Sequence, residues 1–170
     1  MVNAFETFPH LLAPIKVGNV VFRNRMFCAP TGHTDILSTG QPSVDAIMYF
    51  ERKAMGGAAS VTSGEVNVDP EVRTNGRWPR NIMNHSNYNY PRLADAISRH
   101  GAVATLELQF EAGKSRLRLP ADAPMKNTPA WGPVDMDECY GGGTMRAMTE
   151  ERFEEVIKGF GETALAAKKQ

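Results

Sequence analysis

The feature that most constrains the fold of this chain is a strand-like segment followed by a helix-like segment, repeated three times along 170 residues. The strand-like segments are short and mostly apolar, and they span residues 26–30, 58–63 and 102–110. Amphipathic segments follow them at residues 44–55 and 91–100 and from residue 150 onward. Strands that alternate with helices predict parallel β/α units.

Local signals predict where the three helices begin and end. Ser43 and Thr149 are N-cap residues for the first and third helices, and Pro91 suits the first position of the second. Gly56-Gly57 and Gly101 end the first and second helices. The apolar face predicted for the first helix is Val44, Ile47, Met48 and Met55. The face predicted for the third is Phe153, Val156, Ile157, Phe160 and Ala164.

A small hairpin is predicted before the first strand, because alternating apolar residues flank Gly18-Asn19, a pair suited to a tight turn. Long loops follow the strands and short ones follow the helices. This order matches the start of a (β/α)₈ barrel, which typically has about 250 residues. We therefore predict an α/β fold that is a partial (β/α)₈ TIM barrel, with about three β/α units after the hairpin. Residues 1–170 would form the N-terminal part of one domain, and a self-contained doubly wound domain is the alternative.

Composition excludes several classes of function. Lys plus Arg and Asp plus Glu number 19 each, so no excess of positive charge predicts a nucleic-acid or membrane-surface partner. No apolar run approaches the roughly 18 residues of a membrane span. Cys28 and Cys139 lack a CxxC spacing, and with four histidines they form no metal signature. We expect a cytoplasmic protein without a metal site, with Cys28 in the core.

Small and polar residues stand at the ends of the predicted strands, where barrel enzymes carry their chemistry. The first strand runs into Ala29–Gly32, and Glu65 follows the second. Alternation places Glu107 and Gln109 on one face of the third strand. A carboxylate inside a barrel is costly unless it is paired or bonded to a ligand, so Glu107 is either a site residue or a paired core charge. The Pro-Thr-Gly turn is also common as a purely structural element.

Three ordered motifs resemble the old yellow enzyme family, in the branch of the dienoyl-CoA and enoate reductases. They are N-R-x-x-x-A-P at residues 24–30, G-G-x-x-x-x-x-S-G at 56–64, and R-x-M-T-x-E at 146–151. The resemblance extends from about Leu11 to Lys169. It implies a barrel that binds FMN and transfers hydride from NAD(P)H to an activated C=C bond of an enone or enoyl substrate.

The same resemblance implies which residues contact the flavin. They are Ala29 and Pro30 along the ring, Thr31 and Gly32 beside its N5/O4 edge, a backbone group of Glu65, and Glu107 or, with a shifted register, Gln109 at the pyrimidine edge. Gly32 stands where the family commonly has threonine, cysteine or histidine, so Thr31 or His33 would have to tune the flavin.

In the family, the catalytic acid, the groups that hold the substrate carbonyl and the FMN phosphate site come from later strands, and so would lie beyond Gln170. The larger relatives carry any Fe–S cluster in regions further along. We therefore expect this chain alone to be inactive and to need a complementary C-terminal polypeptide or self-association. A barrel for phosphorylated metabolites without flavin, and a non-catalytic half-barrel subunit, are the alternatives. The substrate and the choice between NADH and NADPH are not predicted.

Overall fold

The computed structural model describes residues 3–32, 36–37, 40–69, 82, 88–110, 129–138 and 143–169. Its centre is a parallel sheet with the strand order β3-β4-β5. These strands span Phe27–Thr31, Ser60–Asn67 and Val103–Gln109. The predicted strands are confirmed in number and order, and β4 continues four residues beyond its predicted end at Ser63.

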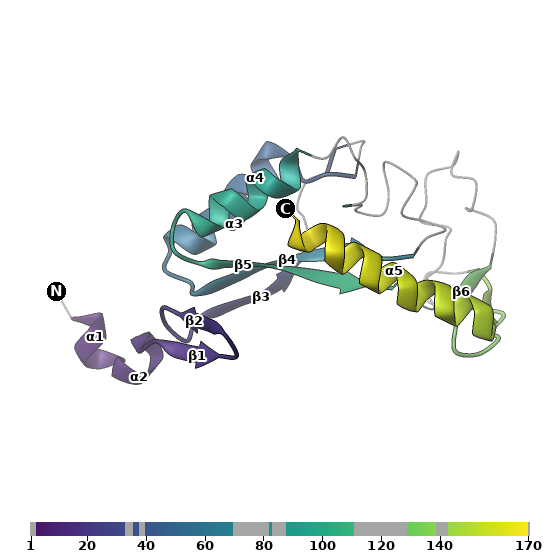
Figure 1. Ribbon diagram of the computed structural model, residues 1–170, viewed down its shortest axis with the longest axis horizontal. Helices are drawn as coiled ribbons and strands as arrows, with labels where there is room; N and C mark the ends of the chain where they lie inside the picture. The colour runs from purple at the N-terminus through teal and green to yellow at the C-terminus, as the bar shows by residue number, and fades with distance from the viewer. Residues whose placement is uncertain are drawn as a thin grey trace.

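Helices α3 (Val44–Met55) and α4 (Asn89–Ser98) lie side by side on one face of the sheet, as Figure 1 shows. Helix α5 (Glu150–Lys168) runs beside them and contacts β5. The core lies between the sheet and this helical layer, and it contains Ile47, Phe50, Val61, Leu93 and Ile97. Cys28 packs against this core, as predicted. A parallel sheet with its crossover helices on one face is the arrangement of a partial barrel.

The predicted N-caps are confirmed. The Ser43 hydroxyl accepts a hydrogen bond from the Ala46 amide at 3.1 Å, and the Thr149 hydroxyl accepts one from the Arg152 amide at 3.2 Å. The pKa of the Glu151 carboxyl is lowered, first by a hydrogen bond from its own backbone N–H and then by one from the Thr149 side chain. Helix α4 begins two residues earlier than predicted, so Pro91 lies within its first turn rather than at its start.

The predicted apolar faces of two helices are largely wrong. In α3, Val44, Met48 and Met55 are 45 to 64% exposed, and the buried face is formed by Ala46, Ile47, Phe50 and Ala54. In α5, Phe153 and Ile157 are about half exposed, and the buried residues are Arg152, Val156, Gly159 and Thr163. Each helix has apolar residues around much of its circumference, and only those that pack against the sheet are buried.

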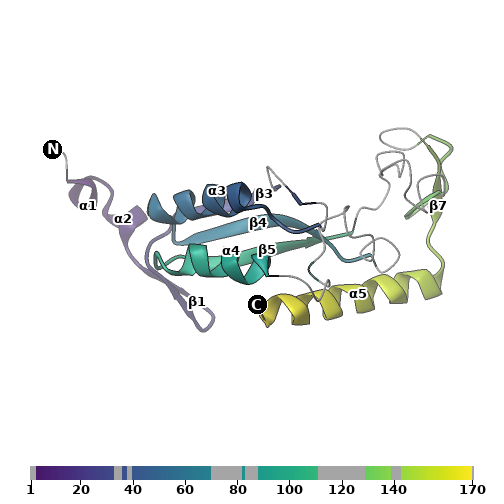
Figure 2. The ribbon, with the colours of Figure 1, turned by 90° about the horizontal axis from the view of Figure 1, so that it is seen from above.

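The hairpin is confirmed as β1 (Ile15–Val17) and β2 (Val20–Phe22), with Gly18 at a φ of 57° in the turn. The short helices α1 (Ala4–Thr7) and α2 (Pro9–Leu12) precede it. Phe22 packs on Phe27 at the start of β3, with ring centroids 4.8 Å apart. The hairpin therefore lies against the amino-terminal end of the sheet (Figures 1 and 2).

Two side chains anchor the segment between the hairpin and β3. Arg23 donates to the carbonyls of Ala54 and Ala58, both at 2.8 Å, and also to the carbonyl of His100. Asn24 donates to the Gly57 carbonyl at 2.7 Å and accepts a hydrogen bond from the Met26 amide. These bonds join the ends of α3 and α4 to the start of β3, so the Asn of the N-R-x-x-x-A-P motif has a structural role.

A second, two-stranded parallel ladder was not predicted. It consists of β6 (Ala130–Gly132) and β7 (Met145–Ala147). Figure 2 shows it beyond the carboxyl ends of the main strands, next to the start of α5. None of the described helices is both long enough and apolar enough to cross a membrane.

Candidate functional site

The carboxyl ends of the three main strands meet around Gly64. Ser63 of β4 is in register with Thr31 of β3 on one side and with Leu106 of β5 on the other. A Cβ atom added at Gly64 would lie 3.3 Å from Cβ of Pro30 and would collide with the carboxylate of Glu107. Two of the predicted site residues, Pro30 and Glu107, are therefore brought together across β4.

The side chains of this cluster lie on the face of the sheet away from the helices. Ser63, Leu106 and Leu108 line a cavity against α4 and α5, so the residues that alternate with them point the opposite way. Thr62 and Thr105 share this second face, with their hydroxyl oxygens 2.7 Å apart. We call this the open face, because none of the described helices packs on it; it comprises Ala29, Pro30, Thr62, Gly64, Thr105 and Glu107.

Strand β3 contains a bulge between Cys28 and Thr31. Cys28 pairs with Val61 and Thr31 pairs with Ser63, so three steps along β3 match two along β4. Cys28 faces the helical core, whereas Ala29 and Pro30 are exposed. The Thr31 hydroxyl accepts a hydrogen bond from Nζ of Lys53 in α3 at 3.1 Å. The side chain of Thr31 is thus held by the helix.

The other predicted site residues lie farther from this cluster. Glu65 is half-buried where the ladder between β4 and β5 is irregular, and its peptide bond to Gly64 is cis. Gln109 is the last residue of β5, in register with Asn67, two residues beyond Glu107. Glu107 rather than Gln109 therefore lies next to Pro30. Gly32 is half-buried directly after β3. His33 and Cys139 lie outside the described residues.

A buried ion pair that the sequence did not predict joins α5 to the end of β4. Arg152 forms a salt bridge with Asp69, and both side chains are more than 90% buried. Arg152 also donates to Glu155 at 2.9 Å, and its guanidinium lies 5.9 Å from the ring centroid of Trp131 in β6. The pair therefore fixes the start of α5 and β6 beside the carboxyl ends of the strands. Across the described ranges, no three His, Cys, Asp or Glu side chains gather closely enough to hold a metal ion.

The cluster around Gly64 has the features that a flat, polar-edged ring requires. Gly64 carries no side chain between its neighbours, and Ala29 and Pro30 present small apolar surfaces. The Glu107 carboxylate accepts hydrogen bonds, and backbone groups at the strand ends can donate or accept. The edge of an isoalloxazine carries both an N–H donor and carbonyl acceptors, so the residues fit the ring of FMN.

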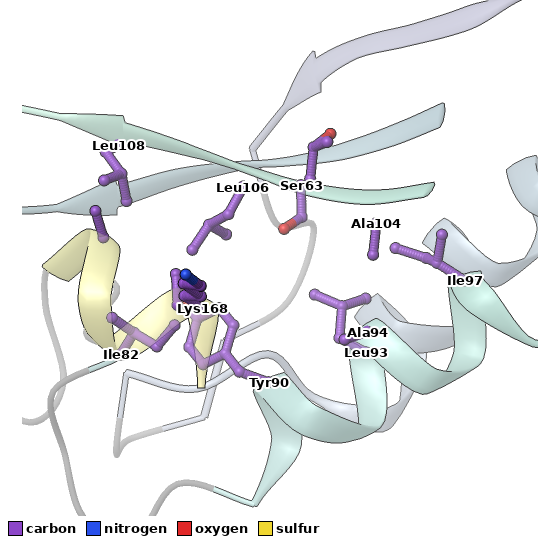
Figure 3. A pocket seen from close by; sticks show the side chains of 13 residues that line it. Ser63, Ile82, Tyr90, Leu93, Ala94, Ile97, Ala104, Leu106, Leu108 and Lys168 are labelled. Atoms are coloured by element: carbon purple, nitrogen blue, oxygen red, sulfur yellow. The ribbon is translucent and has the colours of Figure 1, made fainter. Parts of the chain in front are cut away.

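A cavity of about 290 Å³ lies on the other side of the sheet, between α4, α5 and β5 (Figure 3). Its lining is mainly apolar and includes Leu93, Ile97, Leu106 and Leu108, with Lys168 at one side. None of the predicted site residues is among the described residues that line it. Of the open-face residues, Thr105 also borders the cavity.

Comparison with known families gives one match that spans nearly the whole chain. The sequence profile of the NADH:flavin oxidoreductase / NADH oxidase family matches residues 10–169.

Individual relatives agree with that match. A cinnamate reductase of Clostridium sporogenes is 28% identical over 173 residues, which are 96% of this chain and 25% of that protein. The structure of a 2-naphthoyl-CoA reductase superposes with a TM-score of 0.80 at 24% identity and covers 95% of this chain and 26% of its own. An old yellow enzyme from Pichia sp. AKU4542 gives a TM-score of 0.73 at 18% identity, covering 93% of this chain and 42% of its own. At these identities the two structures establish the fold alone.

The chain is much shorter than these proteins. It spans 22 to 25% of the length of the curated relatives that it matches.

Proposed function

The chain belongs to the NADH:flavin oxidoreductase / NADH oxidase family, and from this premise we propose that it is the N-terminal part of an FMN-dependent reductase of activated C=C bonds. It supplies about the first three β/α units of a single (β/α)₈ barrel and part of the flavin site. NAD(P)H is the reductant, and the substrate is a small enone or enoyl compound. The cinnamate and naphthoyl-CoA reductases among its relatives support this substrate class.

The observation that carries the proposal is the meeting of Pro30, Gly64 and Glu107 on the open face. Barrel enzymes place their active sites at the carboxyl ends of the strands. Here a glycine leaves room, and a proline and a carboxylate stand on either side of it. Residues from three separate strands thus meet at the carboxyl ends of the strands, where barrel enzymes bind their cofactors.

Each residue has a defined part in binding the ring. Ala29 and Pro30 pack against it, and Glu107 accepts a hydrogen bond from its pyrimidine edge. Backbone groups of Thr31, Gly32 and Glu65 complete the contacts, which orient the ring and exclude water from one side. Bound FMN would supply the transfer of a hydride from NAD(P)H to a C=C bond of the substrate.

We assign the remaining parts of the site to polypeptide outside these residues. The proton donor, the groups that hold the substrate carbonyl and the phosphate site are expected in the strands that complete the barrel. The exposed part of the open face (Ala29, Pro30 and Thr105) and the exposed residues Phe153 and Ile157 of α5 are surfaces that further strands and helices would cover.

The test uses the complete protein that contains this chain. We expect it to be yellow and to release FMN when denatured, and the change Glu107→Ala to weaken FMN binding about tenfold or more, because a hydrogen bond to a charged group is lost. Glu107→Gln keeps an acceptor and should retain most of the affinity. Glu154→Gln, at an exposed position of α5, is the matched control. A complete protein that is colourless and does not take up added FMN would refute the proposal and favour a barrel without flavin.

A further inference from the structure

The ammonium group of Lys53 is held in one place by three neighbours. Lys53 lies in the last turn of α3, and its Nζ is 4.3 Å from the ring centroid of Tyr49 and 5.1 Å from that of Phe50. It donates a hydrogen bond to the Thr31 hydroxyl at 3.1 Å. A lysine side chain is normally flexible, and cation–π contacts with two rings restrict it.

Through this hydrogen bond Lys53 holds the carboxyl end of β3. Regular alternation from Cys28, which faces the core, would turn Thr31 toward the open face. The bulge at Ala29-Pro30 reverses this, and the bond from Lys53 keeps the Thr31 hydroxyl on the helix side. The Thr31 hydroxyl also donates to the Ala29 carbonyl at 3.4 Å, so the bond reaches the bulge itself.

We infer that Lys53 is a positioning residue of the flavin site, which acts through Thr31 to fix the bulged end of β3 in the conformation that presents Ala29 and Pro30 to the ring. This inference rests on the proposed function. It differs from the alternative raised by the sequence, in which the Thr31 side chain tunes the flavin. Thr31 instead contributes its backbone, while its hydroxyl serves as the attachment point for α3.

The experiment compares five variants of the complete protein: Lys53→Met, Lys53→Arg, Thr31→Val, the double variant of Lys53→Met with Thr31→Val, and Arg52→Met. Lys53→Met and Thr31→Val remove opposite partners of one hydrogen bond. Arg52→Met removes the same charge from the exposed neighbouring residue of α3 and is the control. FMN affinity is measured by quenching of flavin fluorescence, and the order of residues 27–32 by amide hydrogen exchange. Lys53→Arg is included because it keeps a cationic donor.

We expect Lys53→Met and Thr31→Val each to weaken FMN binding about three- to tenfold, as for loss of one hydrogen bond. Both should speed amide exchange at the end of β3. The double variant should be no worse than the more affected single variant, because both changes break the same contact. Arg52→Met should behave as the wild type, and Lys53→Arg should recover part of the loss.

Additive losses in the double variant, or FMN affinity unchanged by Lys53→Met, would overturn the inference. Faster exchange with unchanged FMN affinity would also overturn it, since Lys53 would then order a segment that the flavin does not need. A wild-type protein that binds no FMN would instead refute the proposed function. In that case the exchange measurement still decides whether Lys53 holds the end of β3.

Discussion

Gly64 in β4 lies between the side chains of Pro30 in β3 and Glu107 in β5. A methyl group there would displace the flexible end of Glu107 and press on Pro30, which is part of a strand and can give way only slightly. The absence of a side chain at this position therefore sets both the packing of the strand ends and the location of the carboxylate.

We expect Gly64→Ala to lower the free energy of unfolding by about 1 to 3 kcal/mol, the usual cost of overpacking. It should also weaken FMN binding, because Glu107 has to move. Denaturant unfolding and FMN titration of the complete protein measure the two effects.

Gly161→Ala is the control for this change. Gly161 is an exposed residue of α5 with no atom within 4 Å of an added Cβ, so alanine should raise stability by about 0.5 to 1 kcal/mol. If Gly64→Ala were as stable as the wild type and bound FMN equally well, the close contact around Gly64 would not exist in solution.

Sequence reasoning picked out two residues that meet in the candidate site, and it missed a contact beside them for a physical reason. Pro30 and Glu107 stand out locally, since one ends an apolar strand and the other is a charge within such a strand. The contact of Lys53 with Thr31 joins residues 22 positions apart through a bulge, and no local pattern signals it. The same bulge turns the Thr31 hydroxyl toward Lys53, which alternation along β3 does not reveal.

Among the elements, α5 is tied to β4 by the pair Asp69 and Arg152. Both charges are almost fully buried, so removing one takes away the buried counter-ion of the other. We expect Asp69→Asn and Arg152→Met each to lower the free energy of unfolding by about 3 to 5 kcal/mol. The double variant should lose less than the sum of the two, because no buried charge remains alone.

A double-mutant cycle by urea unfolding of the complete protein checks this expectation. Lys158→Met breaks the exposed pair of Lys158 and Glu162, whose charged atoms are 3.8 Å apart, and should cost no more than about 1 kcal/mol. Equal costs for the exposed and buried pairs would contradict the assignment of Asp69 and Arg152 as a structural link.

The elements that were predicted well depend on neighbours in the sequence, and those predicted poorly depend on distant ones. Ser43 and Thr149 fix the starts of their helices through bonds to amides three residues away. Which side of α3 or α5 is buried depends on the sheet, so apolar residues such as Val44 and Ile157 were assigned to the wrong face. The ladder of β6 and β7 joins two short segments across a long loop, which no periodic pattern reveals.

At the scale of the whole molecule, large apolar side chains are exposed at several places in the described part of the chain, and two of these places are surfaces that a barrel would cover. Phe27 lies at one end of the sheet, and Phe153, Ile157 and Leu165 lie along α5, each about half exposed. The edges of β3 and β5 also have no further strand beside them among the described residues. Such edges and patches favour association with other polypeptide.

We therefore expect the isolated chain of 170 residues to self-associate when it is expressed alone. Size-exclusion chromatography with light scattering measures this, and replacing Phe153 and Ile157 together with lysine should reduce the associated fraction. Co-expression with the polypeptide that completes the protein should abolish it. A single sharp monomer peak with cooperative unfolding would contradict the expectation and favour a self-contained domain.

The sheet has one side packed against helices and another that presents Thr62, Thr105 and Glu107. Successive residues of β5 therefore bear on different properties of the protein. Changes at Leu106 and Leu108 act on the packing against the helices, whereas changes at Thr105 and Glu107 act on what the open face contacts. A family built in this way can diversify its reactions by altering every second residue of a strand while keeping the scaffold intact.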